Sequence, residues 1–68
     1  MSESVTKRPD GTYEEKLSEN WRVIYAEAPQ NGLWEVEIFN HNVAEWHGTA
    51  YVSLEDARQA AHNFYDQV

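Results

Sequence analysis

Three histidines and a group of glutamates are the residues of this chain whose chemistry could support a reaction or a metal site. His41, His47 and His62 are expected on a loop, a strand and a helix, in that order. None of them has the i, i+4 partner or the nearby cysteine that would set the geometry of a metal site. We therefore interpret the three histidines as surface residues, and we expect neither a bound metal nor another cofactor.

Glu35, Glu37 and Glu45 could converge for acid–base catalysis or for binding a hard cation. We expect them on an open sheet face, which has no pocket that would exclude water or shift a pKa. The sequence also contains no glycine-rich phosphate loop, no nucleophile elbow and no pairing of cysteine with histidine. The prediction is a solvated acidic face on a protein that is not an enzyme.

Length and charge narrow the class of protein further. The 68 residues are enough for one domain, and the absence of cysteine removes disulfides and thiolate metal sites as braces. Twelve acidic and five basic residues give a net charge of −7. This charge repels phosphate backbones and would speed the approach of a basic partner, although acidity also serves solubility alone. Because there is no signal-peptide pattern and no apolar run of about 20 residues, a cytoplasmic location without membrane association is expected.

Periodicity predicts an α+β fold in which a three-stranded antiparallel sheet packs on one C-terminal helix. Two strands rich in aromatic and β-branched residues, at 21–28 and 33–40, flank the turn signal PQNG, and a third strand follows a second turn. Ser53 and Asp56 form an N-cap signal, after which an apolar stripe continues to the C-terminus. The stripe consists of Leu54, Ala57, Ala61, Phe64 and Val68. The order β-β-β-α is thus predicted for residues 21–68.

The predicted register keeps one face of the sheet apolar. A three-residue loop at 30–32, with Gly32 in the left-handed region, achieves this, whereas a two-residue loop would mix Glu27 into the apolar row. A second three-residue loop at 40–42 continues the apolar face into the third strand. The predicted core face carries Ile24, Ala26, Ala28, Trp34, Val36, Ile38, Ala44, Trp46 and Gly48. The predicted outer face carries Trp21, Val23, Tyr25, Phe39, Val43 and Tyr51 together with Glu27, Glu35, Glu37, Glu45 and His47.

The first 20 residues are polar and allow two interpretations. The stretch TYEEK fits a capping box with Thr12 as N-cap and Glu15 reaching back, which would begin a short helix. The stretch RPDG is also a turn signal, and SVTK before it could then pair with TYEEK as a hairpin. We expect residues 1–20 to be a tail with one ordered turn ahead of the domain at 21–68. Whether this segment covers the outer face stays open.

Three stretches resemble a known family. WEVEI, WHGT and SLEDA are similar in order and approximate spacing to the WxAEIR, WLGT and TAEEA elements of the plant ethylene-response-factor (APETALA-type) DNA-binding domain. They are also similar to integrase arm-binding domains of the same β-β-β-α shape. The resemblance covers residues 21–66 and implies that fold, in a family that reads DNA with arginines on the outer sheet face. Two of those arginines fall on Phe39 and Ala44, and Arg22 is the one that could remain, so the resemblance supports the fold and argues against DNA binding.

These observations together predict a small acidic intracellular module that binds another protein. An outer face of aromatic rings and carboxylates would dock on a basic surface, for example as an inhibitor or adaptor from a phage or mobile element that mimics the charge of DNA. The predicted protein-binding residues are Trp21, Tyr25, Glu35, Glu37, Phe39, Glu45, His47 and Tyr51. A homodimer is compatible with the small core. The alternative is a nucleic-acid-binding domain of the β-β-β-α type that acts beside a basic partner.

Overall fold

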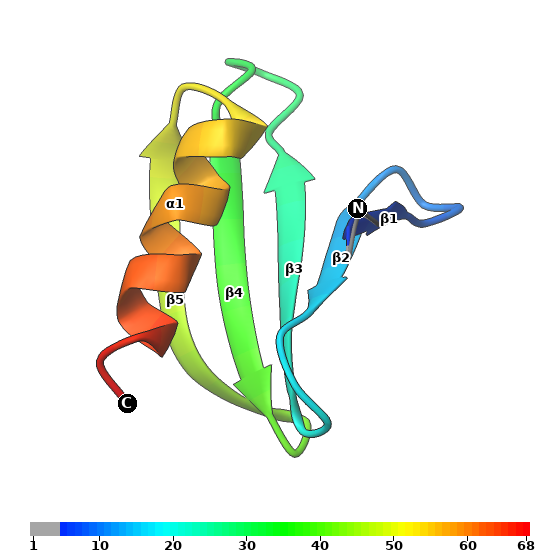
Figure 1. Ribbon diagram of the computed structural model, residues 1–68. Helices are drawn as coiled ribbons and strands as arrows, with labels where there is room; N and C mark the ends of the chain where they lie inside the picture. The colour runs from blue at the N-terminus through cyan, green and yellow to red at the C-terminus, as the bar shows by residue number, and fades with distance from the viewer. Residues whose placement is uncertain (1–4) are drawn as a thin grey trace.

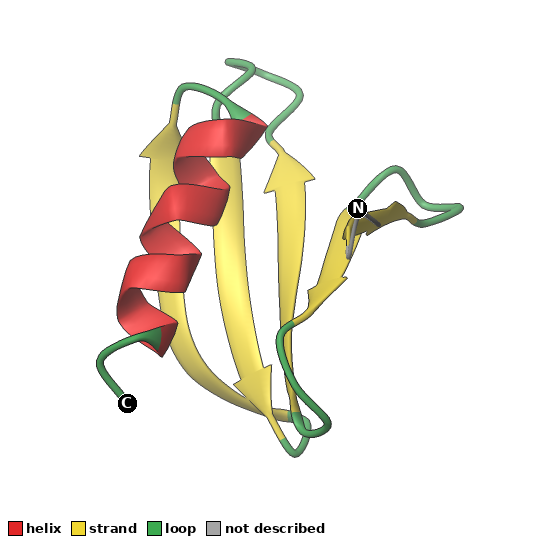
Figure 2. Ribbon diagram, in the orientation of Figure 1, coloured by secondary structure: helices red, strands yellow, loops and turns green. Residues whose placement is uncertain are grey.

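A computed structural model describes residues 5–68 as one antiparallel sheet with a single helix on one of its faces (Figure 1). The five strands lie in chain order (Figure 2). Their bounds are β1 Val5–Lys7, β2 Tyr13–Lys16, β3 Trp21–Glu27, β4 Trp34–Asn40 and β5 Val43–Tyr51, and the helix is α1 Leu54–Tyr65. The predicted α+β class and C-terminal helix are confirmed, but the sheet has five strands where three were predicted. At 12 residues, this helix of the described chain is well short of the roughly 20 needed to cross a bilayer.

The two additional strands come from the N-terminal segment, which folds as a hairpin in the same sheet. The turn is closed by hydrogen bonds from Arg8 N–H to the Thr12 carbonyl (2.7 Å) and from Gly11 N–H to the Arg8 carbonyl (3.0 Å). Asp10 Oδ1 accepts from both the backbone N–H and the hydroxyl of Thr12, at 3.0 and 2.6 Å. Because Tyr13–Lys16 is a strand, no helix begins after Thr12, and the helical interpretation of TYEEK is wrong. The hairpin alternative is the one observed, although Ser4 of SVTK lies outside the described residues.

The β3–β4 hairpin has a different register from the predicted one. Ala28 N–H donates to the Leu33 carbonyl at 2.8 Å, so the loop contains four residues, 29–32, rather than three. Gly32 does take the predicted left-handed conformation, at φ +71°. One additional loop residue shifts the pairing by one, and a shift of one residue exchanges the two faces of a strand.

The shift reverses the predicted faces of β3 and leaves those of β4 unchanged. The buried cross-strand pairs are Val23 with Ile38 and Tyr25 with Val36. Ile24 and Ala26, which were predicted in the core, lie instead on the opposite face, and Ala28 lies between the end of β3 and the loop. The predicted register was chosen because it keeps the charge of Glu27 out of the apolar row. In the structure Glu27 does belong to that row, but it pairs with Trp34 at the very end of the strand, where the carboxylate is exposed. A charge at that position is solvated, so it does not exclude this register.

Strand β5 departs from the prediction through a shorter turn and two irregularities. His41 and Asn42 alone connect β4 to β5, both at positive φ (+52° and +68°), where a three-residue loop was predicted. The register then shifts by one residue near each end of the strand, as it does at β-bulges. The second shift includes Ala50 at φ +67° and turns Tyr51 toward the core, although Tyr51 was predicted on the outer face.

The core lies between α1 and the inner face of β3, β4 and β5 (Figure 1). Ser53 caps the helix as predicted, because its Oγ accepts from Asp56 N–H at 3.1 Å. Ala57 and Ala61 are fully buried, and their small side chains let the helix approach the sheet closely. The helix ends before Val68, which was predicted in the apolar stripe and is 68% exposed.

Aromatic side chains close the margins of this core. Three ring pairs are formed: Trp46 with Phe64 (5.4 Å between centroids), Tyr13 with Trp34 (5.8 Å) and Trp21 with Tyr65 (5.5 Å). Pairs at these separations add stability beyond the area that the rings bury. The small domain therefore extends its core with rings that are partly buried at the edge of the helix–sheet contact.

Gly48 gives space to two of these rings. A methyl group at this position would lie 2.7 Å from Tyr51 Oη and 2.9 Å from Trp46 Cη2. We predict that Gly48→Ala lowers the free energy of unfolding by about 1–3 kcal/mol, because both rings would have to move. Urea denaturation followed by circular dichroism measures the change, and Thr49→Val at the exposed neighbouring position is the control, expected within about 0.5 kcal/mol of wild type. A Gly48→Ala protein as stable as wild type would contradict this packing.

Candidate functional site

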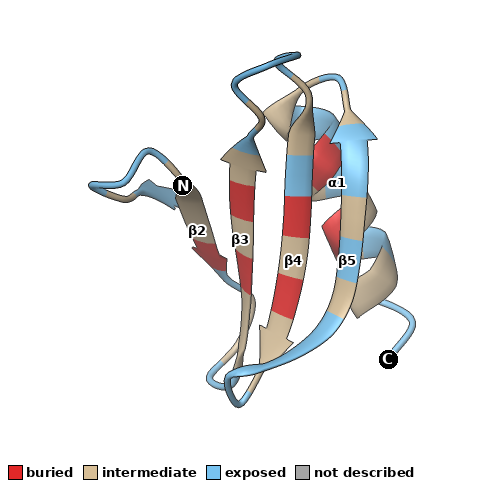
Figure 3. Ribbon diagram, turned by 180° about the vertical axis from the view of Figure 1, so that it is seen from behind, coloured by how far each residue is buried: buried red, intermediate tan, exposed pale blue. Residues whose placement is uncertain are grey.

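The sheet face opposite α1 is the candidate site, because none of the described helices or strands packs over it (Figure 3). Strands β1 and β2 extend the sheet at its edge and leave this face open. We call it the outer face. Strand pairing assigns to it Glu14, Lys16, Arg22, Ile24, Ala26, Glu35, Glu37, Phe39, Ala44 and His47. Ala44 was predicted in the core but pairs with Phe39 on this face.

Three of the predicted binding residues do not lie on the outer face. Tyr25 is fully buried beneath the helix. Trp21 packs against Tyr65 of α1 at 5.5 Å, and Tyr51 packs against the core. Their assignment to an exposed aromatic patch is therefore wrong, because the register of β3 and the irregularity before Tyr51 turn these rings inward.

The structure brings the other predicted residues together. Glu35, Glu37 and Phe39 alternate along the outer side of β4. His47 lies directly opposite Glu37 on β5, and Glu45 is exposed at the first register shift of the same strand. That these five residues contact a protein partner stays a prediction.

A shallow hollow of about 90 Å³ lies at the centre of the outer face. It is lined by the outer-face side chains of Ile24, Ala26, Glu35, Glu37 and His47 and by Val36, whose own side chain is buried in the core on the other face. The volume suits one side chain of a partner and is well below the roughly 300–1,000 Å³ of small-molecule sites. Within residues 5–68, acidic and histidine side chains nowhere gather in groups of three that could hold a metal ion. The hollow is thus suited to contact with another surface.

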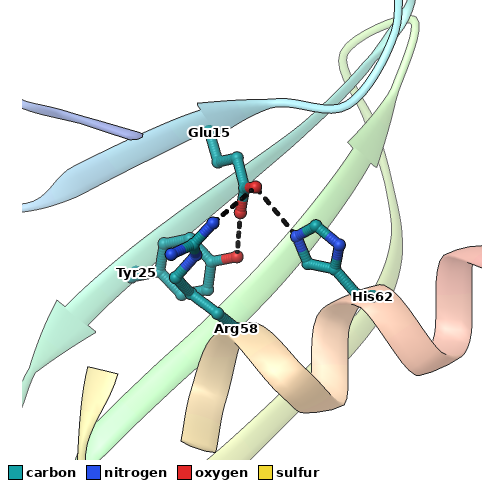
Figure 4. A network of polar contacts seen from close by, with 4 residues as sticks. All are labelled: Glu15, Tyr25, Arg58 and His62. Carbon is teal, nitrogen blue, oxygen red and sulfur yellow. Dashed lines mark hydrogen bonds and ion pairs between the residues drawn. The ribbon is translucent and has the colours of Figure 1, made fainter. Parts of the chain in front are cut away.

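A second polar cluster lies on the helix side of the sheet and was missed by the sequence analysis (Figure 4). Glu15 of β2 is only 3% exposed, and its Oε1 accepts a hydrogen bond from Tyr25 Oη at 2.6 Å. Two side chains of α1 approach the other carboxylate oxygen: Arg58 Nη2 lies 3.3 Å and His62 Nε2 2.8 Å from Oε2. We call these four residues the Glu15 cluster. His62 was interpreted from the sequence as a surface residue; its side chain is 42% exposed, and it also contacts Glu15 of β2.

Hydrogen bonding outweighs burial at Glu15. Burial raises the pKa of this carboxyl group, but the hydrogen bonds from Tyr25 and from the two α1 side chains lower it more, so that it lies below its ordinary value of 4.5. Burial and the neighbouring carboxylate raise the pKa of Tyr25 well above its ordinary value of 10.0. At neutral pH the pair is therefore a carboxylate that accepts from a phenol. Its oxygens are directed at protein donors, which indicates a structural role.

The sequence does contain a signal for this cluster. Tyr13, Glu15 and Leu17 alternate, so the carboxylate has the same phase as two apolar side chains. Arg58 and His62 are four residues apart, which places them one above the other on a helix. An acid in an apolar row and two bases on one helix face indicate a buried ionic contact, once both segments are known to lie in the same sheet–helix unit.

We predict that the Glu15 cluster makes stability fall in acid. Because the pKa of Glu15 is lower in the folded protein than in the unfolded chain, its contribution is complete above 4.5 and is lost as the pH falls toward the folded value. Urea unfolding of wild type and Glu15→Gln between about pH 7 and about pH 3 measures this contribution. The variant should be less stable by about 1–3 kcal/mol at neutral pH, and the difference should shrink in acid.

Two further variants make this test specific. Tyr25→Phe keeps the ring and removes one donor, so it should weaken the acid dependence. Glu55→Gln removes an exposed carboxylate from the same helix and should stay within about 0.5 kcal/mol of wild type at neutral pH. If the difference between wild type and Glu15→Gln stays constant through the whole pH range, the carboxylate does not act as described.

Comparison with models of protein families, with curated protein sequences and with solved structures finds no match in any of the three. The resemblance to the APETALA-type and integrase arm-binding domains therefore stays a prediction. What this chain does has to be inferred from its own surface, and the outer face is the part of that surface where the predicted residues gather.

Proposed function

We propose that this protein is a binding module that docks through its outer face on a basic surface of another protein. The observation that carries the proposal is an uncovered sheet face on which carboxylates surround an apolar hollow. Helix α1 covers one side of the sheet, and the described residues leave the other side open (Figure 3). An exposed surface that combines apolar and charged groups in this way is typical of a contact site.

Charge defines the kind of partner. Glu35 and Glu37 stand at the rim of the hollow, and Glu45 is exposed on the neighbouring strand. The net charge of −7 adds a negative field around them, which attracts a basic surface before contact. Lysine and arginine side chains of a partner can lay their aliphatic stems on Ile24 and Ala26 while their charged ends reach the carboxylates.

The apolar part of the contact is smaller than the sequence predicted. With Trp21, Tyr25 and Tyr51 turned toward the core, Ile24 and Phe39 are the larger apolar side chains that remain on the outer face. Both are half-buried. A contact with two modest apolar anchors and several carboxylates depends strongly on electrostatics, so its affinity should fall as salt is added.

A groove that binds nucleic acid is one basic surface of this kind, because lysine and arginine line it. In that case the carboxylates of the outer face would occupy positions that phosphates otherwise take, and the module would act as an inhibitor or adaptor. The net charge of −7 and the absence of arginine at Phe39 and Ala44, both on the outer face, support binding to a protein over direct binding to nucleic acid.

We predict that a double change on the outer face, Glu35→Gln with Glu37→Gln, abolishes capture of the partner. The tagged wild-type chain and the variant are used in parallel to capture proteins from a lysate of the native cell, which are then quantified by mass spectrometry. The matched control is Glu55→Gln with Asp66→Asn, which removes two exposed carboxylates from the helix side. Proteins bound by wild type and control but lost with the outer-face variant should be basic, and their capture should weaken with added salt.

Other outcomes identify what is wrong in the proposal. Loss of capture in the helix-side control, with the outer-face variant unaffected, would show that the partner contacts α1. Capture that disappears after nuclease treatment would support the alternative of a nucleic-acid-binding domain.

We also predict that two kinds of substitution separate kinetically once a partner is in hand. Ile24→Ala and Phe39→Ala should mainly raise the dissociation rate, by roughly tenfold for an anchor worth about 1.4 kcal/mol. Glu35→Gln and Glu37→Gln should mainly slow association and reduce its dependence on salt. Surface plasmon resonance with the captured partner measures both rates, and equal effects of all four changes on dissociation alone would argue against electrostatic attraction at this face.

A further inference from the structure

The outer face ends in a cleft where two turns meet. The β2–β3 turn and the β4–β5 turn lie side by side at one end of the sheet (Figure 1), joined by a hydrogen bond from His41 N–H to the Asn20 carbonyl at 3.0 Å. The cleft has a volume of about 350 Å³. Its walls include three basic side chains, those of Lys16, Arg22 and His41, together with the polar side chains of Glu14, Glu19 and Asn42.

Two positive charges stand directly opposite each other in this cleft. Lys16 of β2 pairs with Arg22 of β3, so both side chains leave the sheet on the same face. Like charges in this arrangement destabilise a sheet, and these two are among only five Lys and Arg residues of an acidic chain. Among residues 5–68 no carboxylate forms an ion pair with Lys16. An anion between the two side chains would attract both of them and so offset their mutual repulsion.

The guanidinium of Arg22 is held in place by its neighbours. Its Nη2 donates to Asn42 Oδ1 at 2.8 Å, and its plane lies over the ring of Phe39, 5.0 Å from the centroid. Glu14 Oε2 lies 3.8 Å from Nη1, but both side chains are more than one-third exposed, so this ion pair contributes little. A guanidinium has five N–H donors, so a fixed Arg22 keeps donors for a ligand.

His41 supplies a third donor from the facing turn. Its φ of +52° lies in the left-handed region, which is uncommon for residues other than glycine. Two-residue turns of this kind usually contain asparagine followed by glycine. His41 therefore has a less favourable backbone conformation than glycine would have at this position, and its side chain lies on the wall of the cleft.

We propose that this cleft binds a phosphoryl-type oxyanion between Lys16, Arg22 and His41. A phosphoryl group offers several oxygens and up to two negative charges to donors from different elements, and these three residues line the cleft from β2, β3 and the β4–β5 turn. Lys16 and Arg22 balance the two charges of a single phosphoryl group, whereas each further phosphate of a polyanion would add repulsion from Glu14 and Glu19 on the same walls, so the cleft suits a single phosphoryl group. The remaining volume is enough for a small organic part of the ligand.

Titration of the ¹⁵N-labelled chain with inorganic phosphate tests the proposal by NMR. At constant ionic strength, the amide signals of Lys16, Arg22, His41 and Asn42 should shift and saturate, while those of α1 should not. Chloride, added as sodium chloride, is the control anion. Separate titrations with O-phosphoserine and adenosine monophosphate identify the source of the group: tighter binding of one indicates a phosphorylated amino acid or a nucleotide, and equal binding indicates free phosphate.

Surface variants make the assignment specific, and their own spectra report whether they fold. Lys16→Gln and Arg22→Gln should each weaken phosphate binding by roughly threefold to tenfold. His41→Asn tolerates the left-handed turn and removes the imidazole, so it should also weaken binding. Lys7→Gln removes an equal charge from exposed β1 and should bind as wild type does. Shifts that grow without saturation, or wild-type affinity in both Lys16→Gln and Arg22→Gln, would overturn the proposal.

Discussion

The hydrogen bond between Tyr25 and Glu15 is the contact on which the rest of the structure depends. A buried phenol needs an acceptor and a buried carboxylate needs donors, because an unpaired polar group inside a protein is costly. Both needs are met only if β3 turns Tyr25 inward and β2 pairs with β3 in the observed register. Arg58 and His62 of α1 then approach the same carboxylate, so one acid joins two strands and the helix (Figure 4).

The orientation of Tyr25 also determines the composition of the outer face. Side chains alternate along a strand, so with Tyr25 inside, the neighbouring Arg22, Ile24 and Ala26 must face outward. The aromatic rings concentrate on the helix side, where they enlarge a small core. The outer face is left with an acidic centre around a small apolar hollow and a basic end where two turns meet. We therefore propose ligands of opposite charge for its centre and for this end.

Strand β5 shows how local irregularity serves the core of a short chain. Two shifts in its register let the strand bend along the helix, and the second turns Tyr51 inward. Gly48 lies between Trp46 and Tyr51 in sequence, and the absence of a side chain there leaves room for both rings. Without these devices, a regular strand would direct one of the two rings to solvent, because they are five residues apart and strand side chains alternate.

The sequence by itself determined the elements after residue 20 and the inward face of β4, since turn residues, the Ser53 cap and strict alternation act within a few residues. It also placed the β4 half of the candidate site, Glu35, Glu37 and Phe39, on the outer face. Only the tertiary structure decided which side chains of β3 face the core. Val23 and Tyr25 on one side of the strand and Ile24 and Ala26 on the other are all apolar, so alternation does not distinguish the two sides. The orientation of β3 depends on the contacts of Glu15 with Tyr25, ten residues later, and with Arg58, 43 residues later. Glu15 also lies on a strand whose sequence fits the start of a helix. Contacts over such separations form only when the chain is folded, which is why the β3 half of the site and the basic cleft could not be read from local pattern.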